Sequence, residues 1–150
     1  MSPRRARAQL PLALSSRDHL TCFIDGSVQG NHGPGAVGVV IHDSTGEVLE
    51  AWGEAIGHVT NNQAEYHALL RALERARALR AKAVTVRSDS QLLVRQFLGE
   101  YRVKDEKLKP LLAEARRLAQ VFKEFEIEHI PRELNRAADR LANQAREGRA

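Results

Sequence analysis

The stretch Leu20-Thr-Cys-Phe-Ile-Asp-Gly-Ser27 decides the interpretation of the fold. Its residues up to Asp25 are apolar and β-prone, which predicts a short strand that is buried on both faces. Gly26-Ser27 predicts the end of that strand. Asp25 is therefore expected at the carboxyl end of a buried strand.

The segments on the carboxyl side of this strand predict further strands and helices. A glycine-rich loop is expected at residues 30–35, and Asp43-Ser-Thr-Gly46 predicts a turn between two strands. Thr60-Asn-Asn62 can cap a helix, and Asn135 can cap the last one. The expected strands are 36–41, 47–58, 83–88 and 125–130. The first helix is expected to begin after residue 60, and three more helices are expected at 91–98, 105–122 and 136–146.

This order predicts an α/β fold. The first three strands follow one another directly and are expected to be antiparallel, whereas the later strands alternate with helices. We therefore expect a mixed five-stranded sheet with helices on both faces, formed by residues 19–150. Residues 1–18 are rich in Arg, Ala, Ser and Pro without a period, which predicts a flexible arm.

Composition excludes several classes of protein. The chain has 150 residues, 43% of them hydrophobic, which suits one domain with a substantial core. Cys22 is the single cysteine, so an internal disulfide is excluded and a zinc finger is disfavoured. No apolar run approaches the roughly 20 residues that span a bilayer, so we expect no membrane association. The net charge of +4, with 18 Arg among 23 basic residues, permits a nucleic-acid partner.

Four acidic residues, Asp25, Glu65, Asp89 and Asp139, are expected at strand ends or on helix flanks beside buried residues. If the strands before Asp25 and Asp89 are parallel neighbours, both carboxylates emerge at one edge of the sheet. Crowded carboxylates require a compensating cation, and hard oxygen ligands suit Mg²⁺ or Mn²⁺. Taken singly, each of the first three also suits a turn, a helix dipole or a helix cap.

The motifs around these acids resemble those of type 1 ribonuclease H. The similarity covers about residues 20–147. It comprises Phe23-Ile-Asp-Gly-Ser27 with Gly30-Asn-His-Gly-Pro-Gly-Ala-Val-Gly38, then Thr60-Asn-Asn-Gln-Ala-Glu65, Ser88-Asp-Ser-Gln91 and Asn135-Arg-Ala-Ala-Asp139. The resemblance implies the ribonuclease H fold and a metal-dependent endonuclease that cleaves the RNA strand of RNA/DNA hybrids. The implied products have 5′-phosphate and 3′-hydroxyl ends.

The resemblance also implies how the acids are used. Two Mg²⁺ ions, for which Mn²⁺ can substitute, are expected in the site with substrate. Asp25 would bridge both ions, Glu65 and Asp89 would serve the leaving-group ion, and Asp139 would serve the ion that holds the nucleophile. The expected substrate-binding residues are Gly26, Ser27, Asn31, Asn62, Gln63 and Gln91. Asn31 also suits a turn, Asn62 a helix cap and Gln91 an ordinary surface position.

Two departures from the family pattern concern substrate grip and proton transfer. Residues 98–105 are too few for the basic protrusion of many members, so the chain resembles a compact subgroup. Arginines of the arm could supply phosphate contacts instead. Where many relatives have a loop histidine, we expect Arg132 or Glu133 to be auxiliary residues, with His129 as the rival or as a structural residue.

The motifs leave two alternatives to the hybrid nuclease. One is a catalytically weak hybrid-binding module, and the other is a nuclease that also acts on double-stranded RNA. All four acids are present, which favours catalysis. We further expect a cytoplasmic monomer without an obligate protein partner.

Overall fold

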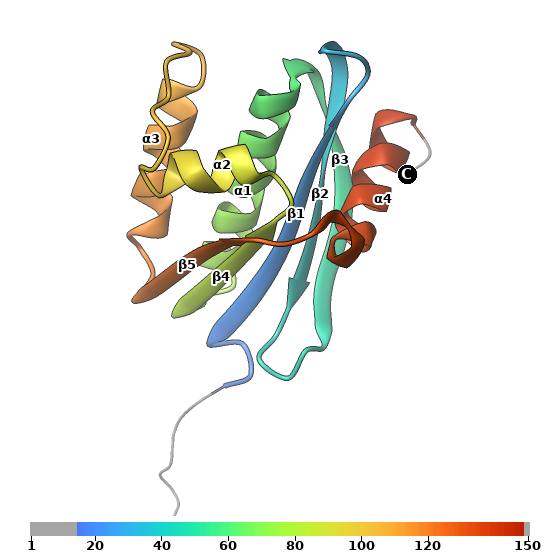
Figure 1. The fold of residues 1–150 in the computed structure, drawn as a ribbon. Coiled ribbons are helices and arrows are strands. Elements are labelled where there is room, and N and C mark those ends of the chain that lie inside the picture. Colours follow the sequence, from blue (N-terminus) through green and yellow to red (C-terminus); the bar gives the residue numbers. More distant parts are fainter. Residues whose placement is uncertain (1–14, 149–150) are drawn as a thin grey trace, which may run out of the picture.

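The computed structural model describes residues 15–148, whose five strands form one sheet in the order β3-β2-β1-β4-β5 (Figure 1). Strands β1, β2 and β3 are antiparallel, and β4 and β5 are parallel to β1, which confirms the predicted mixed sheet. The elements are β1 (His19–Val28), β2 (His32–His42), β3 (Val48–Thr60), α1 (Asn61–Ala78), β4 (Ala83–Ser88), α2 (Gln91–Phe97), α3 (Lys109–Ala119), β5 (Glu124–His129), the 3₁₀ helix η1 (Arg132–Leu134) and α4 (Arg136–Arg146).

Helices cover both faces of the sheet. Helices α1, α2 and α3 lie on one face and α4 lies on the other (Figure 1). The main core lies beneath the first group, where Leu20, Cys22 and Ile24 of β1 are completely buried. Helix α4 approaches the sheet closely because β2 has a glycine at position 38, where a Cβ would overlap the carbonyl oxygen of Ala138. The sheet therefore supports α4 directly under the turn that contains Asp139.

Strand β1 is longer than the sequence predicts. It continues through Gly26-Ser27 to Val28, because these residues pair with residues 35–37 of β2. The expected loop at 30–35 is likewise mostly strand, since β2 begins at His32. Flanking glycines suggest a turn, but two long neighbouring strands supply hydrogen-bond partners that override this local preference.

Helix α3 begins later than predicted, at Lys109 instead of Asp105. Pro110 has no backbone N–H and fits only within the first turn of a helix, which fixes the start nearby. Asp105 instead accepts a hydrogen bond from the backbone N–H of Lys107 in a turn. The connection from α2 to α3, residues 98–108, contains no helix, in agreement with the expected lack of a protrusion.

Residues 1–14 of the expected arm lie outside the described residues. Its last residues, 15–18, form a turn that is attached to the domain. The Ser16 carbonyl accepts a hydrogen bond from Ser44, and the Asp18 carbonyl accepts one from Lys82. None of the helices within residues 15–148 is both long enough and apolar enough to cross a membrane.

Candidate active site

The register of the two central parallel strands brings Asp25 and Asp89 together. The pairing of β1 with β4 ends at Ile24 and Ser88, which are partners. Asp25 and Asp89 are the next residues of their chains, so both carboxylates lie where β4 leaves the sheet. The prediction that Asp25 lies at the end of its strand is wrong, because β1 continues to Val28. Asp25 instead directly follows the end of the parallel pairing with β4, which has the same geometric effect.

The start of α1 brings Glu65 to the same place. Thr60 is the N-cap, and its hydroxyl accepts a hydrogen bond from the Gln63 N–H while the Gln63 side chain accepts one from the Thr60 N–H. This capping box fixes the first turn of the helix. The Gly26 N–H then donates to Glu65 Oε1 at 3.1 Å. A Cβ at position 26 would lie 2.7 Å from the carbonyl carbon of Ala64 and would collide with it. Glycine at this position therefore permits the hydrogen bond to Glu65.

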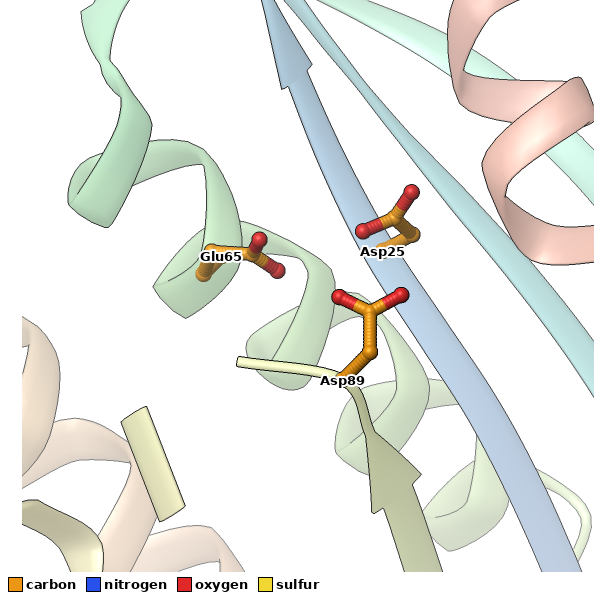
Figure 2. Close-up of side chains that lie close together, drawn as sticks. All are labelled: Asp25, Glu65 and Asp89. Atoms are coloured by element: carbon orange, nitrogen blue, oxygen red, sulfur yellow. The ribbon is translucent and has the colours of Figure 1, made fainter. Parts of the chain in front are cut away.

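The three carboxylates converge on one point. One oxygen each from Asp25, Glu65 and Asp89 lies within 4.8 Å of the other two. Figure 2 shows the carboxylates of β1, of α1 and of the segment after β4 pointing toward one another. Asp25 is buried, and the other two side chains are partly exposed. The site is therefore accessible from solvent but surrounds one largely desolvated carboxyl group.

This convergence is electrostatically unfavourable without a cation. Burial, the charge of Glu65 and a hydrogen bond with Asp139 raise the pKa of Asp25 to about 10. Burial and the charge of Asp89 raise the pKa of Glu65 to about 8, although the Gly26 N–H acts in the opposite direction. Protons or a metal ion can relieve the repulsion. Carboxylate oxygens at this spacing fit a divalent ion with oxygen preference, such as Mg²⁺ or Mn²⁺.

Asp139 lies beside this group but is not one of its three members. It is in the first turn of α4, is partly exposed and lies close enough to Asp25 to raise the pKa of that carboxyl. Its own backbone N–H donates to the Asn135 carbonyl at 3.1 Å. The structure thus places the three converging acids within 4.8 Å of one another and Asp139 near Asp25, on the α4 side.

The residues predicted to bind substrate have different surroundings. Asn31 and Gln91 are exposed, and Asn62 is partly exposed within the first turn of α1. The Ser27 hydroxyl donates to Asn143 Oδ1 at 2.6 Å and accepts from Arg146 at 2.8 Å, so it ties β1 to α4. The Gly26 N–H and the Gln63 side chain are used by the contacts of α1 described above. Asn31, Asn62 and Gln91 are therefore the side chains with the greatest freedom to contact a ligand.

The predicted auxiliary residues lie in and beside η1. Arg132 and Glu133 are both exposed. Arg132 is close enough to Glu65 for its positive charge to lower the pKa of that carboxyl. His129 is the last residue of β5 and is exposed, so it is not a buried structural histidine.

Asn135 is a site residue whose position the sequence did not predict. It precedes α4, but its side chain makes no capping hydrogen bond, so the predicted cap is wrong. Its Nδ2 instead donates to the Ile24 carbonyl at 2.8 Å and to Asp89 Oδ2 at 3.1 Å. The available signal was its distance of four residues from Asp139, which indicates a place near the site but not a partner.

Comparisons with known proteins agree with this geometry. The family model described as "Reverse transcriptase-like" matches residues 23–145. "Ribonuclease HI" of Halobacterium salinarum is 42% identical over 123 residues, which are 82% of this chain and 62% of that relative. The chain therefore spans less than two thirds of that curated relative.

Solved structures are also similar. The crystal structure of RNase H1 from Halobacterium salinarum has a TM-score of 0.85 at 39% identity and covers 87% of this chain and 98% of its own. LC11-RNase H1, solved in complex with an RNA/DNA hybrid, has a TM-score of 0.81 at 40% identity and covers 86% and 97%. The likeness therefore includes the whole described domain and not only its motifs.

Proposed function

Because this chain belongs to the type 1 ribonuclease H family, we propose that it is an endonuclease that hydrolyses the RNA strand of RNA/DNA hybrids. The single observation that supports this function best is the convergence of carboxylate oxygens from Asp25, Glu65 and Asp89 within 4.8 Å. A relative that is 40% identical, with nearly the same fold, was solved with such a hybrid. The proposed products have 5′-phosphate and 3′-hydroxyl ends.

The proposed site holds two divalent ions, with Mg²⁺ as the expected ion and Mn²⁺ as a substitute. When bound, such ions supply activation of a water molecule and stabilisation of the leaving oxygen. Asp25 lies near Asp139 and also faces Glu65 and Asp89, so it is the carboxylate best placed to be shared. We assign Glu65 and Asp89 to the leaving-group side and Asp139 to the side of the attacking water.

The surroundings of the acids prepare them for this role. The Gly26 N–H holds one oxygen of Glu65, so that carboxylate has a fixed orientation before any ligand arrives. Arg132 is exposed and places a positive charge near Glu65. An exposed arginine at this position is suited to a phosphate group of the substrate or product. Arg132, or its neighbour Glu133, is therefore our candidate for the auxiliary role.

Recognition of the hybrid is proposed to depend on shape and on the 2′-hydroxyl groups of the RNA strand. A wide, shallow minor groove exposes these hydroxyls to polar side chains. Asn31, Asn62 and Gln91 are exposed or partly exposed and are the proposed contacts. Gly26, Ser27 and Gln63 complete the proposed substrate-binding set, and their described contacts are with Glu65, α4 and the cap of α1.

A cleavage assay with matched substrates tests the proposal. Strand-labelled RNA/DNA hybrid, RNA duplex, DNA duplex and single strands of one sequence would be incubated under one salt condition with increasing Mg²⁺ or Mn²⁺. We expect cleavage of the hybrid's RNA strand alone, and its loss in Asp89→Asn. Hybrid binding without cleavage at saturating protein would identify a binding module instead, and cleavage of the RNA duplex would broaden the substrate class.

The products and the assembly state have separate measurements. Phosphatase treatment should change the electrophoretic mobility of the fragments that carry the new 5′ ends. Fragments with a new 3′-hydroxyl should support extension by a polymerase. The monomeric state and the cytoplasmic location stay predictions. Light scattering during size-exclusion chromatography would test the first, and localisation of the tagged protein would test the second.

A further inference from the structure

Asn135 is completely enclosed between the central strands and the start of α4. It is 1% exposed and is among the few buried polar residues of the part that the structure describes. Its Nδ2 reaches two acceptors, the Ile24 carbonyl at 2.8 Å and Asp89 Oδ2 at 3.1 Å. One amide group therefore connects the backbone of β1 to the carboxylate that follows β4.

These bonds occur where the sheet itself stops holding the two strands together. The pairing of β1 with β4 ends at Ile24 and Ser88, and the chain then turns away into α2. Asp25 and Asp89 therefore follow the last residues of this pairing. The Asn135 side chain links the two strands at this point. The backbone carbonyl of the same residue accepts the backbone N–H of Asp139 at 3.1 Å. Asn135 thus contacts the neighbour of Asp25 and contacts both Asp89 and Asp139 directly.

The stability of the fold alone does not explain an amide at this position. Asn135 Oδ1 is buried and has no hydrogen-bond partner within residues 15–148. An unsatisfied buried polar atom costs about 1–3 kcal/mol. The side chain does not cap α4 either. The benefit of the amide therefore lies in its two donor contacts.

From this geometry we infer that Asn135 is a positioning residue that holds the Asp89 carboxylate in the orientation that faces Asp25. The inference deepens the proposed function and depends on it for the chemical role of the acids. Groups that orient the ligands of a metal ion typically change metal affinity or activity by about 10–100-fold when they are replaced. We expect an effect of this size from Asn135, which is 1% exposed and acts through Asp89.

The test compares Asn135→Ala with Gln96→Ala. Gln96 is also a buried carboxamide, 7% exposed, and it accepts a hydrogen bond from the Tyr66 hydroxyl at 2.8 Å, between α1 and α2. Both variants should have a lower Tm. Only Asn135→Ala should lower kcat on the hybrid about 10–100-fold with little change in KM, and only this variant should need a higher Mn²⁺ concentration for half-maximal rate.

A second measurement requires no substrate. Mn²⁺ alone should raise the Tm of the parent protein and of Gln96→Ala, and a several-fold higher concentration should be needed for the same rise in Asn135→Ala. If the parent does not cleave hybrids, the proposed function fails, and this titration still decides the role of Asn135. If Asn135→Ala does not fold, Asn135→Leu, which fills a similar volume but has no hydrogen-bond donor, replaces it. Parent-like kcat and Mn²⁺ dependence in the folded variant would overturn the inference.

Discussion

Replacing Asp25 by Asn should stabilise the protein at pH 7 when no divalent ion is present. Asp25 is 5% exposed and faces three other carboxyl groups, so its charged form is disfavoured in the folded protein. Asparagine has nearly the same shape and no charge. The substitution therefore removes a repulsion without opening a cavity, while it should abolish most of the cleavage activity.

The magnitude follows from the pKa of Asp25, which burial and the neighbouring acids raise from 3.8 to about 10. A carboxyl group whose pKa is higher in the folded state destabilises the fold progressively as the pH rises above its ordinary pKa, by about 1.4 kcal/mol per pH unit. Between pH 3.8 and pH 7 this sums to an upper limit of about 4 kcal/mol. Structural relaxation reduces it, so we expect a gain of about 1–3 kcal/mol, or about 2–10 °C in Tm.

Urea and thermal unfolding with a chelator at pH 4 and pH 7 would measure this gain. Near pH 4 Asp25 is protonated in the folded state and half protonated in the unfolded state, so the variant and the parent should differ little. At pH 7 the variant should be more stable. Addition of Mg²⁺ should then stabilise the parent more than the variant and should narrow the difference.

Asp43 offers a matched control with the opposite sign. It is also buried, at 6% exposed, but the Thr45 hydroxyl and the backbone N–H groups of Thr45 and Glu47 lower its pKa. Asp43→Asn should therefore destabilise the protein at pH 7. The reasoning is refuted if Asp25→Asn also destabilises the metal-free protein, or if its gain is the same at both pH values.

Three further predictions concern the surroundings of the acids. Gly26→Ala places a methyl group against Ala64 and should displace Glu65 from Asp25, with a loss of about 1–3 kcal/mol in stability and a loss of cleavage that extra Mn²⁺ restores only in part; parent-like kinetics would contradict this. Because the pKa of Glu65 is raised to about 8, protons compete with the ion for this carboxylate. The Mg²⁺ concentration that gives half-maximal rate should therefore decrease as the pH is raised from 6 to 9, and a constant value would argue against carboxylate ligands. Deletion of residues 2–14, which include three arginines, should weaken hybrid binding and make its salt dependence shallower by up to about 2–3 in the log–log slope, whereas an unchanged slope would show that the segment contributes no phosphate contacts.

Periodic patterns predicted most of the fold, because they depend on local chemistry. The run Ala83–Ser88 is short and β-rich and forms β4, and the apolar stripe after Thr60 forms α1 with the predicted cap. The errors lie where tertiary partners replace local preference. Gly26-Ser27 continues β1 because β2 pairs with it, and the proline at 110 delays α3. Such partners cannot be identified from one segment alone.

The site shows the same division at the level of single side chains. Residue type and strand order predicted that Asp25 and Asp89 meet if their strands are parallel neighbours. They do meet, because the parallel pairing ends at Ile24 and Ser88 although β1 itself continues to Val28. Nothing in the residues themselves indicates that the Ser27 hydroxyl binds Asn143, or that the Asn135 amide crosses from α4 to Asp89. These bonds join positions 46–116 residues apart, so they exist only after the fold has formed.

This distinction affects how the four acids should be interpreted in similar chains. The acids supply the charge of the site, but their relative orientation comes from groups that carry none: the Gly26 N–H on Glu65 and the Asn135 amide on Asp89. A chain can therefore keep every acid and still lose the arrangement if a side chain replaces the glycine or an apolar residue replaces the amide. The acids supply the negative charge that the proposed divalent ions require, whereas the two neutral contacts fix the direction in which the oxygens of Glu65 and Asp89 point.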